Sequence, residues 1–315
     1  MIRKESNLTL KLALFTWMLS MFFSYSAFSD QQKLTNDLDS LMSILGIPHH
    51  SDFNSMTSAS QVWRRSPAQE RWQLPDIKID PPTHTKAMKQ LRLMGLVDEA
   101  KPIGKEFDYV ILLGATVPRM QRRLEYLANL WQDGVRYKRL IFLVGQRPLD
   151  AKIDQVDQLI ANTSGHLATP GSKPITETEG AVMLFQSTHL MPEMRAVPVN
   201  FVDSPRHWNE TYWQRPNTRD TLQSWLRYNP RPGSVLVMSD QPHGLYQSEV
   251  VRQELPESFT IELAAQAADR DTRMVIYLDA LALWLHNLQQ APQHPQPANP
   301  SATAPSKITI PPTRH

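Results

Sequence analysis

The chain has 315 residues, and its 33 Lys and Arg against 31 Asp and Glu give a formal charge of +2. So small a charge excludes the large clustered basic surface that nucleic-acid binding needs, so we expect no nucleic-acid partner. The complete absence of cysteine excludes a disulfide scaffold, a Cys-ligated zinc site and a thiol nucleophile. We expect no metal site, and nothing in the sequence names a cofactor.

Residues 1–29 have the features of a secretory signal peptide. Basic residues come first, an apolar run extends from Leu12 to Phe23, and small residues at Ala27 and Ser29 form a cleavage site. The run is shorter than the roughly 20 residues that a bilayer span needs, so we expect cleavage and an exported, periplasmic or secreted protein. The alternative is an inner-membrane anchor by an uncleaved segment. The mature chain has no transmembrane candidate.

Residues 30–105 are expected to form a helical and irregular N-terminal arm. Apolar residues at helical spacing predict one amphipathic helix over 34–45 and a second over 83–94. The stretch between them is polar and rich in proline. Trp63 and Trp72 lie in it, and we expect both to pack the arm onto the main domain.

Residues 106–290 repeat a pattern of a short apolar run followed by an amphipathic stretch. Continuous apolar runs are typical of strands covered on both faces, and their alternation with helices predicts a parallel sheet. We therefore expect a three-layer α/β domain with about five mainly parallel strands. The expected strands are 109–113, 140–144, 197–202, 235–238 and 259–263, and the expected helices are 119–132, 176–188, 218–228, 244–254 and 274–288. Residues 291–315 contain seven prolines and are expected to be a disordered tail.

Polar residues follow four of these strands, at the carboxyl ends where open α/β sheets bind ligands. After the first strand, Gly114 permits a tight turn or close ligand approach, and Arg119 opens the next helix together with Arg122 and Arg123. Cations at a helix start oppose the helix dipole, which favours an anion-binding role for Arg119 over a solvated helix face. Arg147, after the second strand, either adds to that anion site or is a surface arginine.

Two further loops combine capping patterns with candidate ligand groups. Thr176 and Glu179 have the spacing of a capping box, and Glu179 is either part of that cap or a general base facing the crevice. Asn217 is expected to cap the next helix with Asp220 as its partner, or to bind ligand together with Thr218. Both alternatives stay open on sequence alone.

The loop after the fourth strand carries Ser239, Asp240 and His243. His243 is the best candidate for a group that titrates near neutral pH and acts in acid–base catalysis, although it can also simply pack. Ser239 and Asp240 are candidate ligand-binding residues, while Asp240 can instead cap the following helix. No P-loop, GxGxxG, HExxH or GxSxG string occurs, so the standard nucleotide-binding, zinc-protease and α/β-hydrolase classes lack their usual support.

Taken in order, these loops resemble the YdcF-like family (SanA- and ElyC-like proteins). The resemblance covers residues 106–270 and rests on the segments Asp108–Gly114, Thr176–Glu179, Asn217–Asp220 and Ser239–His243, with Arg119 between the first two. It implies a Rossmann-like fold, a role in the cell envelope and binding of a nucleotide-like ligand. The positions that match the family's recurring residues are Gly114, Arg119, Glu179, Asn217, Thr218 and His243.

The sequence departs from the family pattern at three places. Ala115 follows Gly114 where two glycines are usual, Asp220 and Thr221 stand in place of Glu and Asn, and Tyr246 stands where an arginine is usual. The missing arginine weakens anion binding at the fourth loop and leaves open a diverged or inactive branch.

Two classes of function follow. The first is an exported enzyme that acts on a small anionic or phosphorylated envelope metabolite, with Glu179 and His243 as acid–base groups. The second is a non-catalytic ligand-binding or interaction protein, with Trp208 and Trp213 in the loop after the third strand either lining a contact surface or packing that loop down. The sequence identifies no protein partner.

Overall fold

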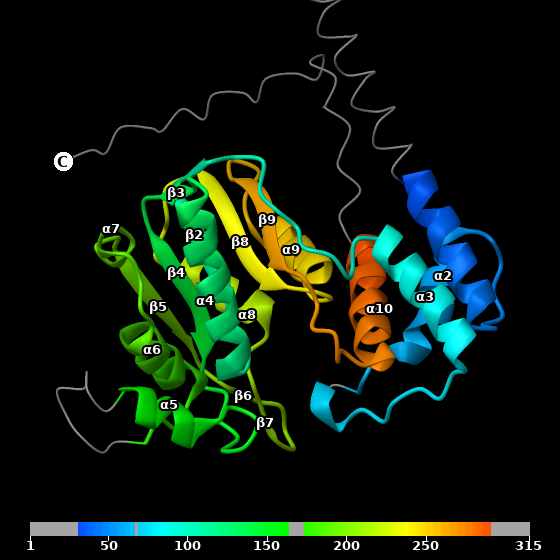
Figure 1. Ribbon diagram of the computed structural model, residues 1–315, viewed down its shortest axis with the longest axis horizontal. Coiled ribbons are helices and arrows are strands. Elements are labelled where there is room, and N and C mark those ends of the chain that lie inside the picture. The colour runs from blue at the N-terminus through cyan, green and yellow to red at the C-terminus, as the bar shows by residue number, and fades with distance from the viewer. Residues whose placement is uncertain (1–30, 67–68, 164–172, 291–315) are drawn as a thin grey trace, which may run out of the picture.

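The computed structural model describes residues 31–66, 69–163 and 173–290. The expected signal peptide and proline-rich tail lie outside these ranges. The described chain forms an α/β body with a smaller group of helices beside it (Figure 1).

A five-stranded parallel sheet with the order β5-β4-β2-β8-β9 forms the centre of the α/β body (Figure 1). Its strands are β2 (Tyr109–Leu113), β4 (Leu140–Gly145), β5 (Val199–Ser204), β8 (Ser234–Asp240) and β9 (Thr260–Gln266). Each strand overlaps one of the five expected apolar runs. β2 matches its run, β4 and β8 extend theirs by one or two residues at an end, β5 begins and ends two residues later, and β9 begins one residue later and ends three residues later. The prediction of a three-layer, Rossmann-like α/β fold is confirmed.

The strand order reverses between β2 and β8. The chain first builds outward from β2 through β4 to β5, then returns to the other side of β2 and continues through β8 to β9. In a doubly wound sheet such a reversal leaves a crevice at the carboxyl ends of the two central strands, because the following helices diverge to opposite faces. β2 ends at Leu113 and β8 at Asp240.

Helices cover both faces of the sheet. One face carries α4 (Val117–Gln132), α5 (Val156–Thr163) and α6 (Glu177–Ser187), and the other carries α8 (Thr218–Leu226) and α9 (Gly244–Glu254). The alternating residues of β2 separate the two cores, since Val110 and Leu112 pack under α4 while Ile111 and Leu113 pack under α8 and α9. Shorter elements complete this body, namely β1 (Glu106–Phe107), β3 (Arg136–Tyr137), β6 (His207–Trp208), β7 (Trp213–Gln214) and α7 (Pro192–Arg195).

The N-terminal arm forms a third core around the last helix, α10 (Met274–Gln290). A helix over 31–44, α2 (Phe53–Ser60) and α3 (Pro81–Leu93) bury their apolar sides against α10 (Figure 1). Leu38, Leu41 and Leu91 are fully buried there. Burial of large aliphatic side chains at about 25 cal/mol per Å² makes this packing a substantial part of the fold's stability.

Two short 3-10 helices, η1 (Gln61–Trp63) and η2 (Arg71–Gln73), connect α2 to α3. Trp63 is buried in the arm's core, as expected, but Trp72 is 38% exposed, so the expectation that both tryptophans pack inward is wrong for Trp72. No described helix combines the length and apolar character needed to cross a bilayer.

Candidate functional site

A cavity of about 730 Å³ lies at the carboxyl ends of β2 and β8, where the strand order reverses. Of the nine residues proposed from the sequence as site residues, the structure brings seven to this crevice. They are Gly114, Arg119, Arg147, Asn217, Thr218, Asp240 and His243. The remaining two, Glu179 and Ser239, do not line it.

Asp240 is the centre of the crevice's main charge cluster. Its side chain is 2% exposed and accepts two hydrogen bonds from Arg119, at 2.9 and 2.8 Å, in a bidentate arrangement. Arg123, which is fully buried, donates to Asp240 at 2.7 Å and to the carbonyl of Leu113 at 2.5 Å. Arg122 lies 3.7 Å from the same carboxylate. Three guanidinium groups therefore surround one carboxylate.

The charge state of Asp240 follows from this geometry. Burial disfavours its ionised form, but Arg119 and Arg123 outweigh the burial and hold the pKa of Asp240 well below its ordinary value. Asp240 is thus a permanent anion that fixes the arginines in place, and it does not cap α9. Ser239 is fully buried and donates a hydrogen bond to Gln247, which also accepts one from Arg123. Ser239 is therefore linked to this cluster through Gln247.

Arg147 holds a second buried charge cluster beside the first. It donates to Glu177 at 2.7 Å and to both oxygens of Asp154 at 3.0 and 2.9 Å. Glu177 reaches the crevice because Gly114 has no side chain. A Cβ on Gly114 would overlap the Glu177 carboxylate and would lie 2.8 Å from the carbonyl oxygen of Leu143. Gly114 therefore allows the Glu177 carboxylate to approach the backbone closely.

Glu177 is the crevice carboxylate that the sequence interpretation missed. Burial raises its pKa, against the opposing influence of Arg147. The capping pattern itself contained the distinguishing signal, because a capping box engages the Glu three residues after the cap, Glu179, and leaves Glu177 in the first turn available.

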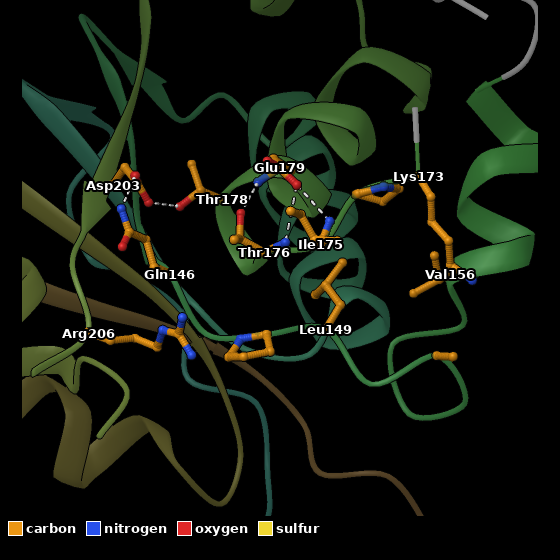
Figure 2. Close-up of a pocket in the computed structure, with 13 residues that line it drawn as sticks. Gln146, Leu149, Val156, Lys173, Ile175, Thr176, Thr178, Glu179, Asp203 and Arg206 are labelled. Carbon is orange, nitrogen blue, oxygen red and sulfur yellow. Dashed lines mark hydrogen bonds between the residues drawn. The ribbon is translucent and has the colours of Figure 1, made fainter. Parts of the chain in front are cut away.

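Glu179 lies on the other side of the same helix start, in a separate pocket of about 520 Å³ (Figure 2). Its carboxylate accepts from the backbone N–H groups of Ile175 and Thr176, and the Thr176 hydroxyl accepts from the Glu179 N–H. The capping box at Thr176 is confirmed. Nothing in this geometry directs Glu179 toward the crevice that holds Arg119 and His243.

Asn217 caps α8, as predicted, and still faces the crevice. Its side-chain oxygen accepts from the N–H groups of Arg219 and Asp220, and Asp220 completes a capping box. The oxygen is therefore engaged, and the side-chain NH₂ remains as the group that Asn217 can offer to a ligand. Thr218, the first residue of α8, lies next to it in the lining.

His243 is 4% exposed and immediately precedes α9. Its Nδ1 is buried and has no hydrogen-bond partner in the part of the chain that the structure describes. Burial, together with the positive charges of Arg119 and Arg71, holds the pKa of His243 well below its ordinary value, and the nearby Asp240 does not compensate. The expectation that His243 titrates near neutral pH is therefore wrong, because burial and two nearby arginines disfavour the imidazolium form.

This neutral histidine makes folding stability depend on pH. The unfolded state binds a proton as pH falls below about 6.5, while the folded state does not, so acidification favours unfolding. We expect the free-energy advantage of the wild type over His243→Gln to shrink by up to about 1.4 kcal/mol per pH unit below that value. Chemical denaturation of both proteins between about pH 7.5 and 5.5 measures this. His286, also of lowered pKa, is present in both proteins and cancels. A pH-independent difference would contradict the assignment.

The N-terminal arm contributes side chains that the sequence gave no reason to place here. Arg65 and Arg71 line the crevice beside Trp72. Arg71 donates to the hydroxyl of Tyr246 at 3.0 Å, and its guanidinium lies 5.2 Å from the centre of that ring. Tyr246 is the position where the family resemblance predicts an arginine, and an arginine from 175 residues upstream contacts it instead.

The crevice carries a clear excess of positive charge. Ten arginines and five carboxylates line it, and three more carboxylates, Asp154, Asp279 and Glu254, pair with lining arginines from outside the lining. Two positive charges remain unbalanced, in a protein whose formal charge is +2, all of which residues 1–29 supply. The lining arginines are Arg64, Arg65, Arg71, Arg119, Arg122, Arg123, Arg147, Arg215, Arg219 and Arg273.

The fold and the crevice define a doubly wound α/β protein with an arginine-lined site at its switch point. Comparison of the chain with protein-family models, with curated proteins and with solved structures finds no match in any of the three. The likeness to YdcF-like proteins remains a prediction from the sequence. Within the described residues, no group of three His, Asp or Glu side chains is placed to hold a metal ion.

Proposed function

We propose that this is an exported, YdcF-like protein that binds a phosphorylated or nucleotide-like metabolite of the cell envelope in the crevice between β2 and β8. The single observation that supports it most is the excess of arginine around a cavity at the switch point. Guanidinium groups bind phosphate oxygens in bidentate geometry, and low-dielectric walls strengthen the attraction. A cavity of about 730 Å³ accommodates a small metabolite.

The proposal assigns roles to two arginines, to the start of α9 and to one carboxylate. Arg119 is 24% exposed at its side chain, so it keeps donor capacity toward a ligand while Asp240 orients it. Arg122, which forms an ion pair with Asp269, lies beside it. The start of α9, where His243 makes no capping hydrogen bond, places a positive helix-dipole end at the crevice. In the enzymatic form of the proposal, Glu177, whose pKa burial raises, is the acid–base group.

The second candidate function is ligand binding without catalysis. It is favoured by the state of the crevice's inner carboxylates, since Asp240 and Glu177 are both held by arginines within hydrogen-bonding distance. Arg119 and Arg123 hold the pKa of Asp240 well below its ordinary value, so Asp240 is a weak base. His243, held neutral by burial and neighbouring arginines, is also a weak base.

Arg119→Gln tests the proposed site. We expect inorganic phosphate and nucleoside phosphates to raise the melting temperature of the wild type, and we expect this substitution to weaken their binding by about tenfold or more, since it removes a charge-assisted bidentate contact. Isothermal titration calorimetry measures the affinities.

Arg92→Gln is the matched control, because Arg92 is 55% exposed and its ion pair among the described residues is with the exposed Asp98 on the arm. Phosphate binding should be unchanged in that variant. A panel of phosphatase and phosphodiesterase substrates separates the two candidates, since turnover supports the enzyme and stabilisation without turnover supports the binding protein. If no phosphorylated compound stabilises the wild type, the proposal fails.

A further inference from the structure

The N-terminal arm reaches the crevice through one anchored cluster. Asp279 of α10 is fully buried, and its carboxylate accepts from the backbone N–H of Arg65 at 3.1 Å and from the Arg65 side chain at 2.8 Å. Arg71 donates to the same carboxylate at 2.8 Å. Two guanidinium groups thus share one carboxylate, which leaves one positive charge in excess on the arm's side of the cavity.

This arm cluster (Arg65, Arg71, Asp279) is a counterpart of the Asp240 cluster. In both, a nearly inaccessible carboxylate orients partly exposed arginines, namely Arg119 at 24% in the Asp240 cluster, and Arg65 and Arg71 at 19% and 17% in the arm cluster. Both sets of arginines line one cavity. The carboxylates fix the donors in position before a ligand arrives, which lowers the entropic cost of binding.

His243 lies between the two clusters. Arg119 and Arg71 both act on its charge state, and its ring packs edge-on against Tyr246, with centres 5.9 Å apart. Tyr246 in turn contacts Arg71 through its hydroxyl. A neutral imidazole has one N–H donor and one acceptor nitrogen, and the buried Nδ1 of His243 has no hydrogen-bond partner among the described residues.

We propose that the crevice binds a ligand with two linked phosphate groups, one held by Arg119 and Arg122 and the other by Arg65 and Arg71 of the N-terminal arm. The inference rests on the proposed function and extends it from one phosphate to a diphosphate. The two arginine clusters supply separate charge excesses, and His243 supplies a polar atom between them. A single phosphate contacts only one of the clusters, and the excess positive charge of the other cluster is then left without a ligand anion.

The test compares inorganic phosphate with pyrophosphate by isothermal titration calorimetry, in a chelator-containing buffer and with the full mature chain. We expect the wild type to bind pyrophosphate at least about tenfold more tightly than phosphate, since a second charge-assisted arginine contact is made. Arg71→Gln should lose about tenfold in pyrophosphate affinity. Its phosphate affinity should change by less than about threefold, because the Arg119 cluster is intact.

Two further variants separate a ligand contact from a structural effect. Arg71→Lys keeps the charge against Asp279 but loses the planar fork, so it should fold like the wild type and still lose part of the pyrophosphate preference. Arg92→Gln, the same kind of change elsewhere on the arm, should bind both probes like the wild type. Limited proteolysis checks that the arm stays docked in each variant.

The outcomes distinguish this inference from the proposed function. If the wild type binds phosphate and pyrophosphate equally well, or if Arg71→Gln and Arg71→Lys both retain full pyrophosphate affinity, the diphosphate assignment is wrong while phosphate binding still stands. If neither probe binds the wild type, both proposals fail. A selective loss of pyrophosphate binding in the Arg71 variants supports the two-cluster site.

Discussion

Asp240→Asn is expected to destabilise the folded protein by about 3–5 kcal/mol, because it leaves buried positive charge without a counter-ion. Arg123 is fully buried and has Asp240 as its charged partner, while Arg119 loses a bidentate contact. An asparagine of nearly the same shape keeps the packing, so the loss reports the missing charge together with the acceptor oxygen that its NH₂ group replaces. Denaturant unfolding at neutral pH measures the change.

The control for this variant is Asp98→Asn, which removes the carboxylate of an exposed pair. Exposed pairs contribute less than about 1 kcal/mol, so this variant should unfold close to the wild type. The prediction also has an internal check, since added phosphate should restore more stability to Asp240→Asn than to the control. A loss of under about 1 kcal/mol for Asp240→Asn would show that water reaches the arginine cluster.

Arg147→Met is expected to destabilise the folded protein by a similar amount, because it leaves buried negative charge, rather than positive charge, without a counter-ion. Arg147 is 6% exposed at its side chain and is the cation that holds Glu177 and the fully buried Asp154. Methionine fills a similar volume but leaves two buried carboxylates without that partner, at a cost of about 3–5 kcal/mol. Urea unfolding measures it, and the deficit should decrease as acid protonates the two carboxylates.

Arg92→Met provides the comparison for Arg147→Met, because it makes the same substitution at a half-exposed arginine. Its unfolding should differ little from that of the wild type. If the free energy of unfolding of Arg147→Met is no lower than that of this control, the buried Asp154 carboxylate is stabilised mainly by the backbone N–H groups of Val117 and Asp150, which also donate to it. The ion-pair account of this cluster would then be wrong.

The sheet was predictable because its strands are buried on both faces. Runs such as 109–113 and 140–144 are continuously apolar, and the structure places them in strands with almost no shift. Helices α2 and α5, in contrast, were not predicted. Each is only 8 residues long, and both depend on tertiary packing, since Met56 of α2 fills the arm core and Leu159 of α5 lies under the sheet.

The predictable part of the candidate site was the set of residues whose positions follow from the parallel sheet. Residues directly after parallel strands meet at one edge, so Arg119, Asp240 and His243 were grouped correctly without knowledge of the strand order. The protonation state of His243 was not predictable, because the shift of its pKa depends on burial and on the positions of Arg119 and Arg71, and Arg71 is far away in sequence. Arg65 and Arg71 themselves follow no strand and belong to no pattern that indicates a ligand.

The anchoring of the arm to Asp279 also determines when the crevice is complete during synthesis. Arg65 and Arg71 precede their carboxylate by 214 and 208 residues, so a ribosome makes almost the whole chain before the arm's contact on α10 exists. A nascent or truncated chain that lacks α10 contains every strand of the sheet and the Asp240 cluster. It lacks Asp279, so its arm cluster is incomplete. If the crevice binds a diphosphate as proposed, its selectivity for that ligand depends on the last helix of the described chain, α10.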